Sequence, residues 1–180
     1  MSKPADTPPM IVPMPRDLLG DPLEFFAADH LRQRAAFALI ERLATASALD
    51  RTLAAHVLEF LGKDMVAHVL DEEDDLFPLL RMRCEAEDDI EHVLGDLSAE
   101  HAAEERVAVD IRTGLAEALE AGCPVGDIEG LGKGMLAFVH AESRHLALEN
   151  GIVFPLARAR LSEDDLRNLS ARMIQRRSSQ

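Results

Sequence analysis

The chain has 180 residues and a formal net charge of −14 at pH 7, and only 4% of its residues are aromatic. A charge of this sign argues against a nucleic-acid partner, because such proteins gain affinity by neutralising phosphates, and against an anionic membrane surface. The length suits one domain with a sizeable core. A composition rich in Leu and Ala, with few runs of β-branched residues, favours an all-helical fold.

The cysteines and the N-terminal segment bear on the compartment. Cys84 and Cys123 lie far apart and outside any Cys-x-x-Cys pattern, which argues against a disulfide framework. The N-terminal segment lacks the pattern of a secretory signal, and no apolar run approaches the roughly 20 residues of a membrane span. We therefore predict a cytoplasmic protein.

Residues 1–20 contain five of the nine prolines and no periodic pattern, so we predict a flexible N-terminal tail. Asp21, Pro22 and Glu24 then stand at the N-cap, N1 and N3 positions of a helix predicted to reach about residue 46. Its apolar stripe contains Phe26 and His30, so His30 is predicted to face the core, although charged side chains interrupt the stripe farther along.

A second helix is predicted to follow a cap made by Ser47 and Asp50. Its apolar stripe carries a histidine and a glutamate, which should therefore point inward. The stripe consists of Ala54, Leu58, Leu61, Met65, His68, Glu72 and Leu76. Pro78 lacks a backbone N–H and crowds the carbonyl of Asp74, so it is predicted to bend or end this helix.

A third helix is predicted to begin at a cap formed by Asp88 or Asp89 and to end near Gly122. Its stripe consists of Ile90, Leu94, Leu97, His101, Ala108, Ile111 and Leu115. A fourth helix should begin near residue 127 and weaken at Gly151 and Pro155. Its stripe consists of Leu131, Met135, Phe138, Glu142, His145, Glu149 and Ile152.

Four helices joined by short links favour an up-down-up-down four-helix bundle. The bundle is predicted to span residues 21–160, between the tail at 1–20 and a segment at 161–180 that holds a short C-terminal helix and a basic end.

A fourteen-residue pattern occurs twice, at 68–81 and at 145–158, and the two copies match at His, Glu, Phe, Pro, Leu and Arg. The His and Glu of each copy are four residues apart and so share one helix face. An acid–His pair precedes each copy, Asp29-His30 and Glu100-His101. A bundle with pseudo-twofold symmetry would bring six residues to one level of the core: His30, His68, Glu72, His101, His145 and Glu149.

A core without metal would bury two carboxylates and four imidazoles, each at a cost of several kcal/mol unless paired. We therefore predict that these six residues bind metal. The other histidines, His56, His92 and His140, fall off the stripes and are predicted to lie at the surface or flank, with His140 near the level of the site.

Several nearby acids have more than one interpretation from the sequence. Asp64 is either an acceptor for an imidazole N–H or a polar residue with another partner, and Glu73 is either solvated or paired with another helix. Glu105 is a candidate seventh ligand, although a salt bridge is favoured. Asp29 and Glu100 could orient the histidines, but exposed charges are the preferred interpretation because adjacent helix residues diverge.

Nitrogen and oxygen donors without thiolate suit Fe, Mn or Zn. Two octahedral ions offer about twelve coordination positions. Four histidines, two bridging carboxylates and an oxo or hydroxo bridge fill all but about two of these. The count favours a dinuclear centre with one open position on each ion, whereas a single tetrahedral zinc would leave buried ligands unused.

These motifs resemble the hemerythrin-like family with the HHE cation-binding domain, over roughly residues 20–158. The shared pattern is Asp-His, then His-x3-Glu with Phe-Pro, then Glu-His, then a second His-x3-Glu with Phe-Pro. The resemblance implies two non-haem iron ions in a four-helix bundle, with Zn or Mn as substitutes. The implied ligands are His30, His68, Glu72, His101, His145 and Glu149, with Glu72 and Glu149 bridging.

Departures from the oxygen carriers of that family narrow the function. Leu97 and Glu105 stand one turn either side of His101, where the carriers have a further histidine, and the fourth helix has His-x3-Glu instead of their His-x4-Asp. Reversible O2 carriage is therefore disfavoured. The ligand set looks closer to that of bacterial di-iron proteins linked to nitric oxide stress and iron–sulfur repair. Those proteins usually carry an additional N-terminal domain with a cysteine motif. The N-terminal tail of this chain has no Cys, which argues against a repair role.

The sequence leaves four functions open. We predict a di-iron module that binds or reacts with O2, NO or peroxide in redox or stress sensing or response. The alternatives are a di-iron enzyme of the oxidase, peroxidase or NO reductase kind, an iron-handling protein, and a zinc-stabilised structural bundle. The sequence does not separate sensing from catalysis, nor does it identify a redox or signalling partner or the oligomeric state.

Overall fold

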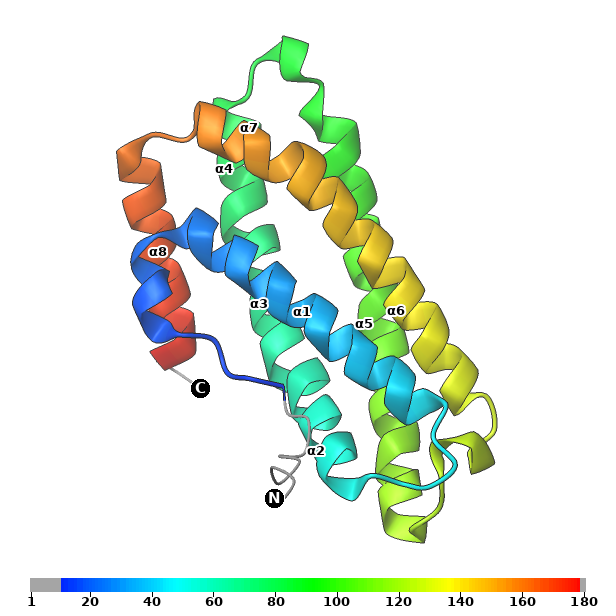
Figure 1. The fold of residues 1–180 in the computed structure, drawn as a ribbon. Coiled ribbons are helices and arrows are strands. Elements are labelled where there is room, and N and C mark those ends of the chain that lie inside the picture. The colour runs from blue at the N-terminus through cyan, green and yellow to red at the C-terminus, as the bar shows by residue number, and fades with distance from the viewer. Residues whose placement is uncertain (1–10, 179–180) are drawn as a thin grey trace, which may run out of the picture.

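The computed structural model describes residues 11–178, and every regular element within that range is helical (Figure 1). The prediction of an all-helical fold is confirmed. The predicted N-terminal tail lies partly outside the described residues, at 1–10, as does the end of the basic segment at 179–180. Of the remaining tail, Arg16–Gly20 forms the 3-10 turn η1.

The described helices form four long stretches and a shorter one, coloured from blue to red in Figure 1. The first stretch is α1 (Pro22–Ala44). The second comprises α2 (Arg51–Glu59), η2 (Phe60–Asp64), α3 (Met65–Asp71), η3 (Glu72–Leu76) and α4 (Phe77–Arg83). The third comprises the turn η4 (Ala86–Asp88) and α5 (Ile90–Ala121). The fourth comprises η5 (Val125–Asp127), α6 (Leu131–Leu148), η6 (Glu149–Val153) and α7 (Phe154–Arg160). The fifth and shorter stretch is α8 (Glu163–Ser178).

Aspartates cap the first two stretches. The side chain of Asp21 accepts a hydrogen bond from the backbone N–H of Glu24, and Asp50 accepts one from Leu53. Each bond satisfies a backbone donor that the first helical turn leaves free. Asp50 alone, without Ser47, therefore caps the second stretch.

The later starts differ in detail from the prediction. Asp89 precedes α5 in a left-handed conformation, with φ of 47°, and its side chain makes no capping bond. The fourth stretch becomes α-helical only at Leu131, because Gly130, with φ of 76°, turns the chain after η5.

Three segments, η2, η3 and η6, are π-helical turns within otherwise continuous helices. In η3 the N–H of Phe77 bonds to the carbonyl of Glu72, and in η6 the N–H of Phe154 bonds to the carbonyl of Glu149. Pro78 was predicted to bend or end its helix, and the second alternative is wrong. The wider turn accommodates a residue without an N–H, so the helix continues to Arg83.

The same π turn corrects the predicted apolar face of the fourth stretch. Ile152, placed on the buried stripe from a constant helical period, is 36% exposed, whereas Val153 is fully buried. A π turn holds more residues than an α turn, so the face shifts by about one residue after Glu149.

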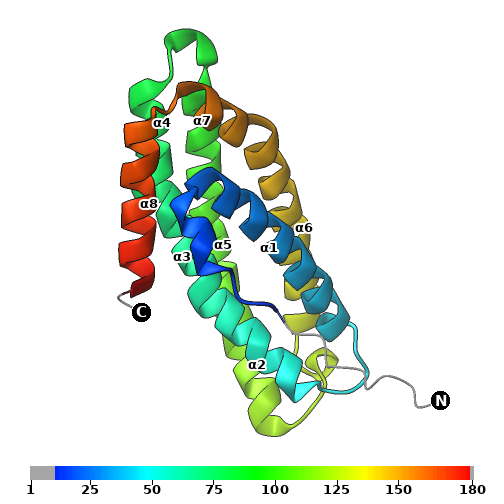
Figure 2. The same ribbon diagram turned by 60° about the vertical axis from the view of Figure 1, so that its left-hand side comes forward.

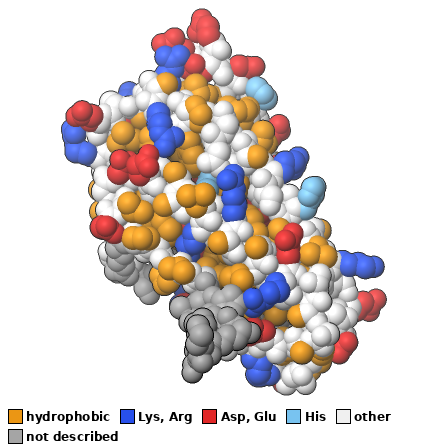
Figure 3. Space-filling view, viewed as in Figure 1, with side chains coloured by type: hydrophobic (Ala, Val, Ile, Leu, Met, Phe, Trp, Pro, Cys, Tyr) orange, Lys and Arg blue, Asp and Glu red, His pale blue; other side chains and the backbone are white. Residues whose placement is uncertain are grey.

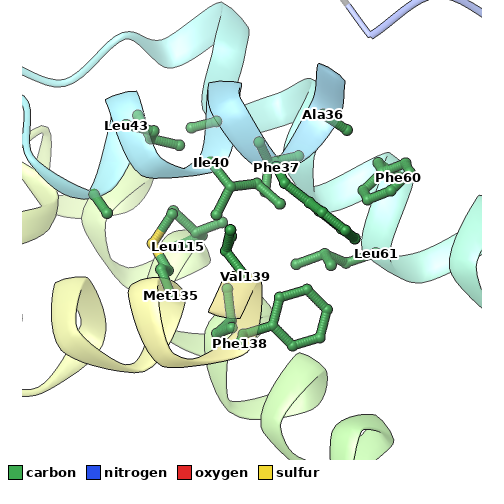
Figure 4. Packing of buried hydrophobic residues seen from close by; sticks show 14 of the residues in the cluster. Ala36, Phe37, Ile40, Leu43, Phe60, Leu61, Leu115, Met135, Phe138 and Val139 are labelled. Carbon is green, nitrogen blue, oxygen red and sulfur yellow. The ribbon is translucent and has the colours of Figure 1, made fainter. Parts of the chain in front are cut away.

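The long stretches pack along one another around two apolar clusters (Figures 1 and 2). α6 packs against α1 and α5, and α2 packs against α1 and α5. Figure 4 shows one cluster, in which Phe37, Ile40, Phe138 and Val139 converge from α1 and α6. The other contains Phe26, Leu76, Phe77, Leu94 and Phe154. Along the second stretch, His68 and Glu72 lie between residues of the two clusters, namely Met65 and Leu76.

α8 lies across the starts of α1 and η1 and beside α3 (Figures 1 and 2). Its arginines face the acidic turn that contains Glu72. Arg176 pairs with Asp71 and, at 2.9 Å, with Asp75, and both carboxylates are buried. Arg177 also pairs with Asp71, and its guanidinium lies 4.7 Å from the ring centre of Phe25. α8 therefore supports the π turn from outside.

The surface in Figure 3, seen from the side of α1, carries acidic and basic side chains interspersed with apolar ones. The excess negative charge therefore does not form a single-sign patch on this face. None of the described helices is long and apolar enough to cross a membrane.

Candidate metal centre

The structure brings the six predicted ligand residues together from four helical stretches. His30 comes from α1, His68 and Glu72 from the second stretch, His101 from α5, and His145 and Glu149 from the fourth. All six are buried, with exposed fractions of 7% or less. Because His30 is buried, the prediction that this face of α1 points to the core is confirmed, although charged side chains interrupt the apolar stripe.

The six residues form two overlapping groups of four that could each hold a metal ion. One group is His30, His68, Glu72 and Glu149, and the other is Glu72, His101, His145 and Glu149. Within each group the potential ligand atoms lie within 4.8 Å of one another. Both glutamates belong to both groups, so each carboxylate can offer one oxygen to each of two ions.

The distances between potential ligand atoms in each group match those between adjacent ligands of one metal ion. His68 Nε2 and His101 Nε2 each lie 3.4 Å from a different oxygen of Glu72. His145 Nε2 lies 3.0 Å from one oxygen of Glu149, and His30 Nε2 lies 3.4 Å from the other. Two donors that are each about 2.0–2.2 Å from one ion lie roughly 3 Å apart when adjacent, so these spacings fit coordination.

Several buried atoms at this point have no hydrogen-bond partner within the described residues. They are His30 Nε2, His68 Nε2, both oxygens of Glu72 and one oxygen of Glu149. Buried polar atoms in native proteins are nearly always paired, because an unpaired one costs about 1–3 kcal/mol. The unpaired atoms here are nitrogen and carboxylate oxygen, the donors that iron, manganese and zinc accept. The residues present therefore fit a pair of such ions.

The pKa values of the site residues also indicate that the two buried glutamates lack a balancing positive charge. Burial and the neighbouring carboxylate of Glu149 raise the pKa of Glu72 well above its ordinary value. Burial disfavours a charged imidazole at His145, but Glu149 outweighs it and raises the pKa of His145 to about 9. Burial and the nearby His68 lower the pKa of His30 to about 4. Metal ions would replace protons as the charge that balances the two glutamates.

Acidic residues outside the six hold two of the imidazoles by their second nitrogen. Asp29 lies 3.0 Å from His68 Nδ1, and Glu100 lies 3.0 Å from His145 Nδ1. Asp29 is 2% exposed, so its predicted exposure is wrong. Each acid acts on a histidine of another helix and not on its own neighbour in sequence, which is how two divergent helix residues can serve one centre.

The residue after each shared glutamate contacts one of the remaining two histidines. Glu73 lies 2.6 Å from His101 Nδ1 and also accepts a hydrogen bond from Ser98. The side-chain amide of Asn150 lies 3.0 Å from His30 Nδ1. The two halves therefore correspond closely, but one has an anion where the other has a neutral amide.

Comparison with protein families gives the identity of the fold. The family model of the hemerythrin HHE cation-binding domain matches residues 21–157. The chain belongs to this family. A comparison with curated individual proteins gave no match.

Phenylalanines of the two Phe-Pro pairs close the hemerythrin-like centre from either side. The ring of Phe77 stacks on His101, with ring centres 5.9 Å apart, and the ring of Phe154 lies 4.8 Å from that of His30. Both rings are buried. Each phenylalanine also donates the π-turn hydrogen bond to a shared glutamate, so one motif orders the backbone and shields an imidazole.

Other candidates from the sequence lie outside the six-residue site of this hemerythrin-like domain. His92 and His140 are exposed, His56 is half-buried, and none joins a described metal-binding group. Glu105 is exposed and also joins none. Asp64 lies 3.2 Å from Arg32, so its partner is a guanidinium and not an imidazole.

A second pair of acids beside the centre was not predicted. Glu142 was placed on the inward face of its helix without a role, and it is 3% exposed. It hydrogen-bonds with Glu104, whose carboxylate lies 3.9 Å from His145 Nδ1. Burial and the charge of Glu104 raise the pKa of Glu142 well above its ordinary value. The inward phase of Glu142 was the available signal, but its pairing across helices was not visible in the sequence.

Proposed function

We propose that the chain is a non-haem di-iron protein that binds or reacts with O2, NO or peroxide. The single observation that carries the proposal is the sharing of Glu72 and Glu149 by two groups of buried donors. In this proposal one ion would be held by His30 and His68 and the other by His101 and His145, and Glu72 and Glu149 would be shared by both.

The proposed architecture is the up-down-up-down four-helix bundle of the hemerythrin type, with α8 added. Supporting it are the four long stretches, their pairwise packing and the family match. Residues at one level of such a bundle project into a common core, which is where bundles hold metal pairs.

The donor set supports iron, with manganese or zinc as substitutes. Four imidazoles and two carboxylates suit each of these ions, and membership of a cation-binding family agrees with metal binding. When bound, the iron pair would supply redox chemistry and coordination positions that the six side chains do not fill. The site's own residues orient the imidazoles and, through Phe77 and Phe154, limit the access of water.

We propose a role in redox or stress sensing or response, in the cytoplasm, with a small oxidant as the natural ligand. A di-iron enzyme is the second candidate, and the pair Glu104–Glu142 favours it. Two carboxyl groups that share a hydrogen bond beside His145 hold a proton close to the centre, where a reduction of the ligand would consume one.

Rapid mixing separates these functions. Reduced, iron-loaded protein is mixed without air with O2, with NO or with hydrogen peroxide, while the near-ultraviolet spectrum and ligand consumption are recorded. A spectral change with at least one ligand is expected, with one equivalent consumed by a sensor and many by an enzyme given reductant. The exposed variant His92→Ala should behave as the parent protein. Two irons per chain and no response to any ligand would refute the proposed function.

A further inference from the structure

A cavity of about 370 Å³ lies between η2, α3, α5 and α6, and His101 and Glu142 are among the residues that line it. It falls in the range of about 300–1,000 Å³ that is typical of small-molecule sites. A water molecule occupies only about 30 Å³ of liquid, so the cavity far exceeds the needs of O2 or NO. The size calls for a larger ligand than the proposed function requires.

Much of the cavity lining is apolar. Its walls include Leu61, Met65, Val69, Ala102 and Phe138. At the rim, Val66 and Val109 are 42% and 50% exposed. Exposed apolar side chains that surround an apolar cavity gain free energy when a ligand with an apolar body covers them.

Arg112 lines the cavity beside Gly62 and has an unpaired guanidinium. It is exposed and, like Arg106 on the same helix, makes no hydrogen bond or ion pair with the described part of the chain, whereas Arg32, Arg83 and Arg160 are paired with acids; unlike Arg106, it lines the cavity. One turn away on α5, the neighbours of Arg112 are all apolar: Ala108, Val109, Leu115 and Ala116. An unpaired cation in a chain of net charge −14 is suited to an anionic group on a ligand.

Gly62 creates the space for this guanidinium. A Cβ at position 62 would lie 3.2 Å from the central guanidinium carbon of Arg112. The side chain therefore rests on the backbone of the π turn η2, which orients it at the cavity wall. A side chain at position 62 would require the guanidinium to shift by a few tenths of an ångström.

The acids that line the cavity do not cancel this cation. Glu73 is bonded to His101 and Ser98, and Glu104 and Glu142 bond to each other. Glu105 is exposed and forms no ion pair with Arg112 within the described residues.

We propose that the cavity binds an amphiphilic monocarboxylate with a linear apolar chain. Its carboxylate pairs with Arg112, and its chain lies along Met65 and Val69 and points toward His101. The inference rests on the proposed function in that it places this molecule beside the metal pair as a co-ligand or substrate.

Calorimetric titration of the iron-loaded protein with decanoate tests the proposal. Binding to the parent protein is expected. Arg112→Gln should weaken it by about ten- to a hundredfold, because a charge-assisted hydrogen bond is lost. Gly62→Ala should also weaken it. Arg106→Gln, an exposed arginine on the same helix, should have no effect, and neither Arg112→Gln nor Gly62→Ala should alter the binding of 1-decanol.

Failure of decanoate to bind, or equal affinity in the parent protein and Arg112→Gln, would overturn the proposal, as would tighter binding of decylamine than of decanoate. Iron content and the response to O2, NO and peroxide are measured on the same samples. If the parent protein responds to the metal ligands but does not bind decanoate, this inference is refuted; if it binds decanoate but does not respond to O2, NO or peroxide, the proposed function is refuted.

Discussion

Replacing Asp29 by Asn and Glu73 by Gln should weaken metal binding to different extents and at different ions. Asp29 holds His68 and is 2% exposed, whereas Glu73 holds His101 with a side chain that is 28% exposed. Loss of such an outer partner typically costs about 10–100-fold in metal affinity, or about 1.4–2.7 kcal/mol. The loss of affinity in Asp29→Asn should lie near the upper end of this range, because Asp29 is buried and little screened by water. The loss in Glu73→Gln should lie near the lower end, because Glu73 is partly exposed and water can partly replace it.

The assay is a competitive titration of each protein with Co²⁺ against a colorimetric chelator, which resolves the two binding events. Asp29→Asn should weaken the event assigned to His30 and His68, and Glu73→Gln the event assigned to His101 and His145. Asp74→Asn is the matched control, because its side chain is 61% exposed and contacts no imidazole. Equal losses in all three variants, or none, would refute the reasoning from burial and hydrogen bonding.

Two further predictions concern α8. Arg176→Ala should lower the free energy of unfolding in urea by about 1–3 kcal/mol, because the buried carboxylates of Asp71 and Asp75 each lose a charged partner; an unchanged midpoint would contradict this. Hydrogen bonds from Arg83 and Ser162 lower the pKa of Asp165 in the folded protein. The stabilisation by Asp165 should therefore be complete above an unfolded-state pKa of about 3.9 and be lost as pH falls toward the folded value. Asp165→Asn should destabilise the protein at pH 7 and less at pH 3, and the reverse order would refute the assignment.

Periodicity and repetition were sufficient to locate the helices and to single out the buried His and Glu residues. A repeated His-x3-Glu on an apolar stripe leaves little choice of direction, because the alternative faces are charged. The identity of the atoms that would be bound and the reaction with O2, NO or peroxide stay predictions, since helical phase says nothing of either.

The departures arise where a constant helical period fails. The π turns after Glu72 and Glu149 extend helices past Pro78 and Pro155 and move Val153, not Ile152, into the core. The repeated Glu-x4-Phe-Pro spacing was a visible signal of this, but its meaning depends on backbone bonding that no stripe records.

The outer carboxylates were misjudged for a different reason. Asp29 and Glu100 diverge from the histidines beside them, and this argued for exposure. Their partners, His68 and His145, lie on other helices. Contacts of this kind depend on how the helices are rotated relative to one another, which the sequence of one helix does not specify. The available signal in the sequence was the acid that precedes both His30 and His101.

The most direct test of the central claim is the metal content of protein loaded anaerobically with Fe²⁺ and freed of excess. Sharing of the glutamates predicts two irons per chain, with loss of both in Glu149→Ala and retention of about one in His30→Ala, because Glu149 belongs to both groups and His30 to one. One ion per chain in the parent protein, or two irons retained in Glu149→Ala, would contradict the dinuclear centre.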